Sequence, residues 1–157
     1  MFIYLIAEGD LIRAARLREL FGIKEGQTVE SAIHFRDKLK MKEKLQEHQI
    51  KVPTFMRADT ATDILKFAEE KGFPFVIKPS CGYSSVNTVA IKNKEDLEHY
   101  FSSGVLDKLQ QGMDVKLGVD IESFVFGPMY HIDGMIVNNQ PFCMWPSKYL
   151  NTCIDLV

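Results

Sequence analysis

A lysine that follows an apolar run and precedes a loop of small and polar residues is the sequence's best candidate for chemistry. Residues 73–77 are apolar, Lys78 and Pro79 end the run, and residues 80–88 lead to a second apolar run at 89–91. The pattern predicts a buried strand, a loop and a returning strand. Lysine supplies a point charge and the loop supplies amide and hydroxyl donors, which together suit a phosphate group. An ordinary hairpin with a solvated lysine explains the same pattern and stays open here.

The composition is typical of a globular protein. The 157 residues are 46% hydrophobic and 25% charged, with a formal net charge of -2. This length allows one sizeable core or two small lobes. The charge gives no basic field, so nucleic acid is not expected as a partner. The three cysteines form no C-x-x-C pair, which favours a reducing cytoplasm. No apolar run approaches the roughly 18 residues of a membrane span, so no membrane partner is expected.

The first third of the chain is predicted to contain a β-α unit and then a charged helix. Residues 2–7 are apolar and predict a core strand. Helical spacing of apolar residues predicts a helix over residues 11–21, capped by Asp10 and stopped by Gly22. Residues 35–47 are the most charged segment, and they predict a surface helix whose lysines, Lys42 among them, are solvated.

The remaining segments predict two helices and several strands. Thr60 and Asp63 form a capping-box pattern for a helix over 60–71, which Gly72 ends, and Asn93 caps a helix over 93–101. Period-two alternation from Val115 and Leu117 to Glu122 predicts a strand. Two further strands are predicted over residues 130–137 and from Gln140 to Trp145, joined by a hairpin turn at Asn138-Asn139. The fold class is therefore α+β: helices pack on one face of a mostly antiparallel sheet.

Three segments, in order, resemble motifs of the ATP-grasp superfamily, in the branch of biotin carboxylase, carbamoyl-phosphate synthetase large chains and amino-acid ligases. The first is Asp37-Lys38-x-x-Met41-Lys42-x-x-Leu45, followed by Ile50-x-Val52-Pro53. The second is Gly72-Phe73-Pro74-x-Val76-Ile77-Lys78-Pro79. The third is Ile121-Glu122-Ser123-Phe124-Val125-x-Gly127. Each match alone is weak, but their order and spacing make the set specific.

The resemblance implies a nucleotide, ATP, held between two lobes. It places Lys38 and Lys78 on the phosphates, with Ser84 and Ser85 in the mobile loop above them. It places Glu122 at the adenine amino group and the backbone of Ser123, Phe124 and Val125 at the ring edge. Two lysines neutralise phosphate charge without demanding directional geometry. Apolar neighbours such as Ile77 and Val125 are expected to sandwich the ring.

The resemblance also implies a domain division. Residues 1–33 are expected to be the remnant of an N-terminal domain. Residues 34–157 are expected to form the N-terminal part of an ATP-grasp domain, with the small nucleotide-gripping lobe and the start of the large lobe. We therefore expect a piece of a longer protein, in which exposed apolar surface leaves a homodimer open.

Three departures from the family pattern affect the expected site. Ser84 and Asn87 stand where glycines are common, although asparagine tolerates a positive φ. Met129 stands where relatives often have a glutamate for the ribose, and His131 or Asp133 either replaces it or faces solvent. The family's Mg²⁺ ligands are expected beyond residue 157, and Asp155 is isolated, so no metal ligand is assigned.

Three functional hypotheses follow. The leading one is the ATP-binding portion of an ATP-dependent carboxylate–amine (or thiol) ligase that works through an acyl phosphate and is inactive as this chain alone. The second is a degenerate ATP-grasp module that binds nucleotide or a partner without catalysis. The third is a small α+β domain without a nucleotide site. Cys81 is interpreted as a small loop residue, since no partner base is identifiable.

Overall fold

The computed structural model describes residues 2–105, 118–138 and 140–151. Contacts divide the chain into two compact units, Met1–Phe124 and Val125–Val157. The predicted strand residues Val115 and Leu117, the turn residue Asn139 and the isolated Asp155 lie outside the described residues. Within the described part, no helix is long and apolar enough to cross a membrane.

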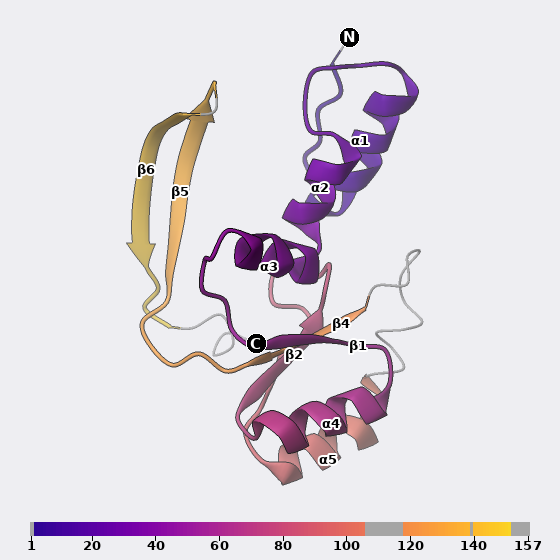
Figure 1. Cartoon of the computed structure of the whole chain (residues 1–157), viewed down its shortest axis with the longest axis vertical. Helices are drawn as coiled ribbons and strands as arrows, with labels where there is room; N and C mark the ends of the chain where they lie inside the picture. Colours follow the sequence, from indigo (N-terminus) through magenta and orange to yellow (C-terminus); the bar gives the residue numbers. More distant parts are fainter. Residues whose placement is uncertain (1, 106–117, 139, 152–157) are drawn as a thin grey trace. The chain divides into compact units, whose positions relative to one another are not determined.

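Four antiparallel strands form the sheet of the first unit (Figure 1). Their order is β1-β4-β2-β3, and their bounds are β1 Phe55–Ala58, β2 Phe75–Pro79, β3 Val89–Ile91 and β4 Val119–Ser123. Each neighbouring pair is antiparallel. The strand predicted from the central apolar run and its returning partner are thus β2 and β3, and the predicted α+β class is confirmed.

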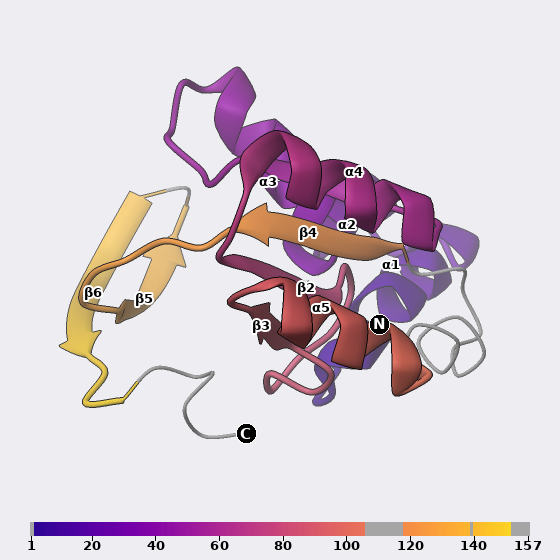
Figure 2. The same ribbon diagram turned by 90° about the horizontal axis from the view of Figure 1, so that it is seen from below.

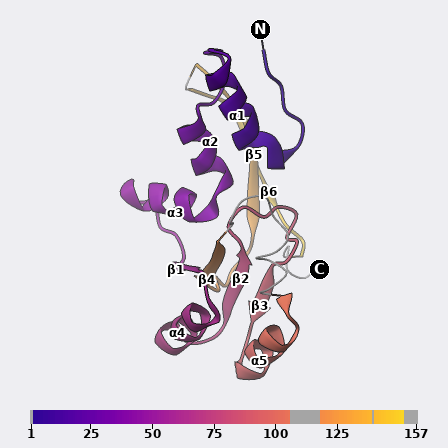
Figure 3. The same cartoon turned by 90° about the vertical axis from the view of Figure 1, so that its right-hand side faces the viewer.

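Two helices, α4 (Ala61–Lys71) and α5 (Lys94–Ser102), cover one face of this sheet (Figures 2 and 3). Alternate strand residues point toward them because successive side chains of a strand face opposite ways. Phe75 and Ile77 of β2 and Ile121 of β4 are fully buried there. The rings of Phe67 and Phe75 meet edge to face at 5.6 Å. The apolar core of the unit therefore lies between this face and the two helices.

The predicted helix caps are confirmed in α4 and α5. The Thr60 hydroxyl accepts a hydrogen bond from the Asp63 backbone N–H at 3.3 Å, and the Asp63 carboxylate accepts one from the Thr60 N–H at 2.9 Å. Gly72 follows α4 with a φ of 73°. The Asn93 side chain accepts from the Asp96 N–H at 2.8 Å. These bonds satisfy backbone donors that a helix start leaves without partners.

The predicted core strand over residues 2–7 is wrong. Residues 2–6 form neither helix nor strand, and Ile6 is fully exposed. An apolar segment becomes a strand only beside another strand, and none of the described strands pairs with it. A 3-10 turn, Glu8–Asp10, leads into α1 (Leu11–Leu20), which confirms that helix. The Asp10 side chain does not cap it but accepts from Arg13.

The charged segment predicted as one helix over residues 35–47 is two helices. Asp37 is extended, with a ψ of 113°, and separates α2 (Val29–Arg36) from α3 (Lys38–Glu47). Its carboxylate accepts hydrogen bonds from the Leu39 and Lys40 N–H groups, so it caps α3. The sequence analysis missed α2, which the Thr28 side chain caps. Helix α1 packs on α2, and α2 packs on α3.

The second unit is a β-hairpin. Strands β5 (Tyr130–Val137) and β6 (Gln140–Lys148) are antiparallel, with Val137 opposite Gln140. Both predicted strands are confirmed, and β6 continues three residues past Trp145, the predicted end.

The core between the sheet and α4 predicts a sharp contrast between two neighbouring residues. Ile64 is fully buried and Leu65 is 45% exposed. Ile64→Ala should lower the free energy of unfolding by about 2–5 kcal/mol, because it removes buried apolar contacts and leaves a cavity. The control Leu65→Ala should cost less than about 1 kcal/mol, because alanine favours the helix and little burial is lost. Urea denaturation of both variants measures this, and equal losses would contradict the described packing.

Candidate functional site

The face of the sheet opposite α4 and α5 carries charged residues. The alternation that turns Ile77 and Ile121 toward the core turns Lys78, Asp120 and Glu122 the other way. Lys78 lies directly opposite Asp120 in the register of β2 and β4. The polar face predicted for β4 therefore exists but is not solvated. Asp120 is fully buried, and the Glu122 side chain is 14% exposed.

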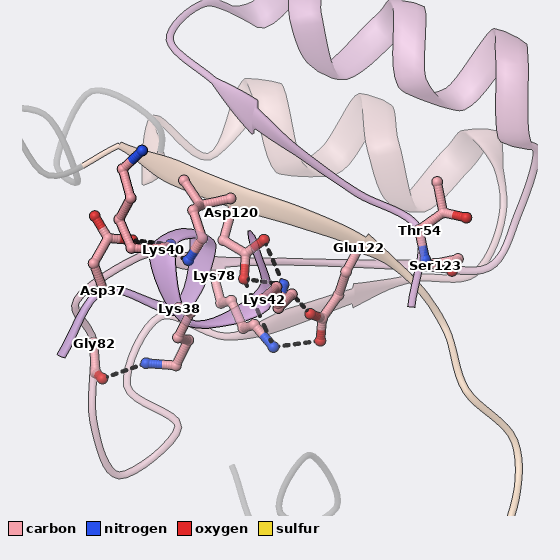
Figure 4. A network of polar contacts seen from close by, with 11 residues as sticks. Asp37, Lys38, Lys40, Lys42, Thr54, Lys78, Gly82, Asp120, Glu122 and Ser123 are labelled. Carbon is pink, nitrogen blue, oxygen red and sulfur yellow. Dashed lines mark hydrogen bonds and ion pairs between the residues drawn. The ribbon is translucent and has the colours of Figure 1, made fainter. Parts of the chain in front are cut away.

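Lys42 of α3 covers this charged face, and its predicted exposure to solvent is wrong. Its ammonium group donates to the two carboxylate oxygens of Asp120 at 2.8 and 2.6 Å and forms an ion pair with Glu122 (Figure 4). It also lies 4.9 Å from the centroid of the Phe55 ring. Helical spacing in a lysine-rich segment indicated an exposed face, but two carboxylates on the sheet provide a buried partner.

Lys78 completes a cluster of two cations and two anions. Its ammonium group is ion-paired with Glu122 and lies 4.0 Å from Asp120. Burial raises the pKa of the Glu122 carboxyl, but the charges and hydrogen bonds of Lys78 and Lys42 outweigh burial and hold that pKa below its ordinary value. Glu122 is therefore an ionised hydrogen-bond acceptor at neutral pH.

Lys38 begins α3 and ties it to the loop after β2. Its backbone N–H donates to the Ser80 carbonyl at 2.9 Å, and its ammonium group donates to the Gly82 carbonyl at 2.6 Å. Arg36 donates to the same Gly82 oxygen at 3.1 Å. Burial, and then repulsion by Lys78 and Arg36, lower the pKa of Lys38. Three cations thus gather at the base of the loop, and two of them have carboxylate partners: Arg36 lies 3.6 Å from Glu8, and Lys78 is ion-paired with Glu122.

The loop adopts the backbone conformations that glycine usually supplies. Ser84, Ser85 and Asn87 have φ values of 52°, 55° and 58°. The expected positive φ of Asn87 is confirmed, and the two serines adopt the left-handed region as well. A Cβ added at Gly82 would lie 3.1 Å from the Pro79 ring, so a side chain there would require the ring to give by a few tenths of an ångström. Backbone N–H groups in such turns form concave sites for anions.

The residues expected at the ring edge hold β4 in place. The Ser123 N–H donates to the Thr54 carbonyl at 2.8 Å, and the Phe124 N–H donates to the Pro74 carbonyl at 3.2 Å. Val125 begins the second unit and is 68% exposed. Ile77 is fully buried on the core face, so its predicted contact with a ring beside Lys78 is wrong. Val76 shares the face of Lys78 instead.

Two groups of contacts contain the expected residues Lys38, Lys78 and Glu122 and three that the sequence analysis missed. Lys78 and Glu122 form one network of ion pairs with Lys42 and Asp120 (Figure 4). Lys38 and Arg36 both donate to the Gly82 carbonyl, and the charge of Lys78 helps to lower the pKa of Lys38. The sequence offered one sign that Lys42 belongs to the site, which is its place in the lysine-containing first motif. Arg36 and Asp120 had no such sign apart from lying next to motif residues.

Other residues singled out from the sequence lie as follows. In the second unit the exposed His131 imidazole lies 3.2 Å from the Asp133 carboxylate, and the Met129 carbonyl accepts from the Tyr149 N–H. Cys81 is buried, and burial raises the pKa of its thiol. Among residues 2–105, 118–138 and 140–151, no three metal-binding side chains of the His, Cys, Asp or Glu type gather in one place.

Comparisons with known proteins extend these observations. The family model described as carbamoyl-phosphate synthase L chain, ATP binding domain, matches residues 37–133. The D-alanine–D-alanine ligase of Francisella philomiragia is 41% identical over 95 residues, which cover 60% of this chain and 31% of that protein. The L-arginine-specific L-amino acid ligase of Bacillus subtilis is 31% identical over 146 residues, which cover 90% of this chain and 34% of that protein.

A structural likeness supports the fold. The carboxyaminoimidazole ribonucleotide synthase of Aspergillus clavatus, solved in complex with ATP, superposes with a TM-score of 0.70 at 14% identity. The match covers 91% of this chain and 36% of that one. The chain therefore spans about a third of the length of these relatives.

The buried charge cluster predicts an asymmetry between single and double substitutions. Lys42→Met should lower the free energy of unfolding by about 3–5 kcal/mol, because it leaves Asp120 as a buried charge without its main partner. Adding Asp120→Leu should recover most of that loss, because a pair of well-packed apolar residues replaces the ion pair. Denaturation of the three proteins measures this, and a double variant no more stable than the single one would contradict it.

Proposed function

The chain belongs to the ATP-grasp family described by the ATP-binding domain of the carbamoyl-phosphate synthase L chain, and on this basis we propose that it binds an adenine nucleotide. One observation carries the proposal: Lys78 and Glu122, which the family pattern selects, are ion-paired on the charged face of the sheet, and Lys38, which it also selects, donates to the Gly82 carbonyl in the loop that follows Lys78. Structural neighbours solved with ATP or ADP support the choice of ligand.

The proposed roles follow from charge and position. Lys38 and Lys78 neutralise the phosphates, and the turn at Ser84 and Ser85 offers backbone N–H and hydroxyl donors to them. Glu122, ionised beside its lysines, accepts a hydrogen bond from the adenine amino group. The backbone of Ser123, Phe124 and Val125 contributes to the ring edge. Mg²⁺, when bound by the longer protein, would supply charge neutralisation at the phosphates.

Lys78 and Glu122 are ion-paired with each other in the free chain. The proposed roles require Lys78 to exchange this partner for phosphate oxygens and Glu122 to exchange it for the base. Both exchanges replace one charge-assisted contact by another, so the nucleotide does not leave a buried charge without a partner. The pair therefore keeps both groups in place before the ligand arrives.

For the whole protein we propose an ATP-dependent carboxylate–amine (or thiol) ligase. The matched curated relatives are ligases, and the chain covers about a third of them. A carboxylate activated as an acyl phosphate is the reaction expected of the family, and we expect this chain alone to be inactive. Residues 1–33 are proposed as the remnant of a preceding domain and residues 34–157 as the start of the ATP-grasp domain. A homodimer and a cytoplasmic location stay predictions.

A second candidate is a degenerate module that binds nucleotide without catalysis. Met129 in place of a ribose-binding glutamate and the serines in the loop favour it. The two candidates separate in the longer protein, where ATP and a panel of carboxylates with hydroxylamine as the nucleophile would trap an acyl phosphate as a hydroxamate. Hydroxamate formation favours the ligase, and nucleotide binding without it favours the degenerate module.

The first prediction concerns affinity. ATP should bind the chain saturably, and Lys78→Ala should weaken binding at least about tenfold, because a charge-assisted contact to phosphate is lost. Lys40→Ala is the matched control, since Lys40 pairs only with the exposed Glu43 among the contacts described on α3. Isothermal titration calorimetry measures the affinities. Absence of saturable binding in the unaltered chain would overturn the proposed function.

The second prediction concerns pH. The pKa of Lys38 is lowered in the free chain, and bound phosphates would raise it by favouring the ammonium form. Below the free pKa the lysine is charged in both states and affinity is greatest. Between the pKa of Lys38 in the free chain and its pKa in the complex, binding of the nucleotide takes up a proton, so the affinity falls as the pH rises. This fall in affinity should begin at a pH below 10.5, the ordinary pKa of lysine.

Lys38→Arg tests the assignment, since a guanidinium stays charged over this range. Calorimetry in buffers of different ionisation enthalpy should detect proton uptake in the unaltered chain and much less in Lys38→Arg. Equal uptake in both proteins would assign the titration to another group.

A further inference from the structure

The buried cluster beneath α3 contains a lysine that the proposed function leaves without a role. Lys42 is 7% exposed, and its three N–H donors have three carboxylate oxygens as partners. Two of these oxygens belong to Asp120, which is fully buried, and one belongs to Glu122. The ammonium group is thus fixed on one side by Asp120 and faces Glu122 with its remaining donor.

Binding of a nucleotide would change the surroundings of Glu122. Three charged groups face this carboxylate: Lys42 from α3, Lys78 from β2 and Asp120 from its own strand. On the β1 side its register partner is the uncharged Phe55. When Lys78 turns to the phosphates, Lys42 is the cation that stays in contact with Glu122. Without it, a carboxylate buried beside Asp120 would favour the protonated form.

We propose that Lys42 is a positioning residue for base recognition, which holds Glu122 ionised and directed toward the base while Lys78 serves the phosphates. The inference rests on the proposed function and deepens it. Asp120 has a supporting part, because it occupies two donors of Lys42 and so fixes the direction of the third. Base choice and phosphate binding are then assigned to different lysines of one cluster.

This arrangement distinguishes adenine from hypoxanthine. An ionised carboxylate only accepts hydrogen bonds, so it fits the amino group of adenine and is repelled by the carbonyl oxygen that hypoxanthine has in its place. A protonated carboxyl group can donate to that oxygen. ATP and ITP carry the same triphosphate, so contacts to Lys38 and Lys78 cancel in the ratio of their affinities. The ratio therefore reports the state of Glu122.

The experiment measures ATP and ITP affinity by calorimetry between pH 5 and 8 for the unaltered chain and three variants. Lys42→Met removes the proposed cation, and Lys42→Met with Asp120→Leu removes it without leaving a buried charge, which guards against loss of the fold. Lys40→Met is the matched control on the same helix, because its partner Glu43 is exposed. Circular dichroism checks that each variant is folded.

The unaltered chain and Lys40→Met should prefer ATP across the range. In Lys42→Met the preference for ATP over ITP should be about tenfold smaller. As the pH is lowered, this preference should begin to fall at a higher pH than in the unaltered chain, because Glu122 protonates more readily without Lys42. The double variant should change in the same direction by less, because loss of the Asp120 charge relieves repulsion on Glu122. A general loss of packing would weaken ATP and ITP equally and leave the ratio and its pH profile unchanged.

Two negative results have different meanings. If the unaltered chain binds both nucleotides and the ratio is the same in all folded variants, the role of Lys42 is overturned and the proposed nucleotide site stands. If the unaltered chain binds neither nucleotide, the proposed function is overturned and the role of Lys42 falls with it.

Discussion

Two carboxylates and two ammonium groups that lie largely out of water between α3 and the sheet are the constraint on which the rest of the site depends. Removing four charges from water is costly unless each finds close partners of opposite sign. Lys42, Lys78, Asp120 and Glu122 meet this requirement because they alternate in sign around one cluster. The cluster fixes how α3 lies on the sheet, and with α3 it fixes Lys38 at the start of that helix.

The loop after β2 depends on the same arrangement. Its base is held by the donors of Arg36 and Lys38 at the Gly82 carbonyl, so the helix start and the loop are positioned together. The left-handed turns of the loop are then formed by Ser84, Ser85 and Asn87 and not by glycine. Backbone conformations that are unfavourable for residues with a side chain often occur at functional sites, where surrounding contacts hold them. In the proposed function such a loop would be shaped for the phosphates before they bind.

The two faces of one small sheet thus have different tasks. The face toward α4 and α5 is apolar and supplies the stability of the unit. The opposite face exposes little to water yet carries charge, and that combination strengthens electrostatic contacts because the local dielectric is low. The proposed function would give this polar face a purpose, since a nucleotide carries both a charged phosphate chain and a base with directional hydrogen bonds.

Local pattern determined much of this protein. The capping pairs of α4 and α5, the strands on either side of the loop, and the hairpin of β5 and β6 could be read from the sequence because each depends on neighbours along the chain. The choice of Lys38, Lys78 and Glu122 as site residues came from the resemblance to family motifs and stays a prediction. The tertiary structure decided the burial of Lys42 and Asp120, the break at Asp37 and the absence of a strand over residues 2–6. Each of these outcomes depends on residues that are distant in sequence. Lys42 is buried because its carboxylate partner lies 78 residues away, and the helix that begins after Asp37 has its first backbone N–H bonded to Ser80. Residues 2–6 form no strand because none of the described strands pairs with them. Periodicity reports which side of an element is polar, but only the packing of distant elements decides whether that polar side meets water or an opposite charge.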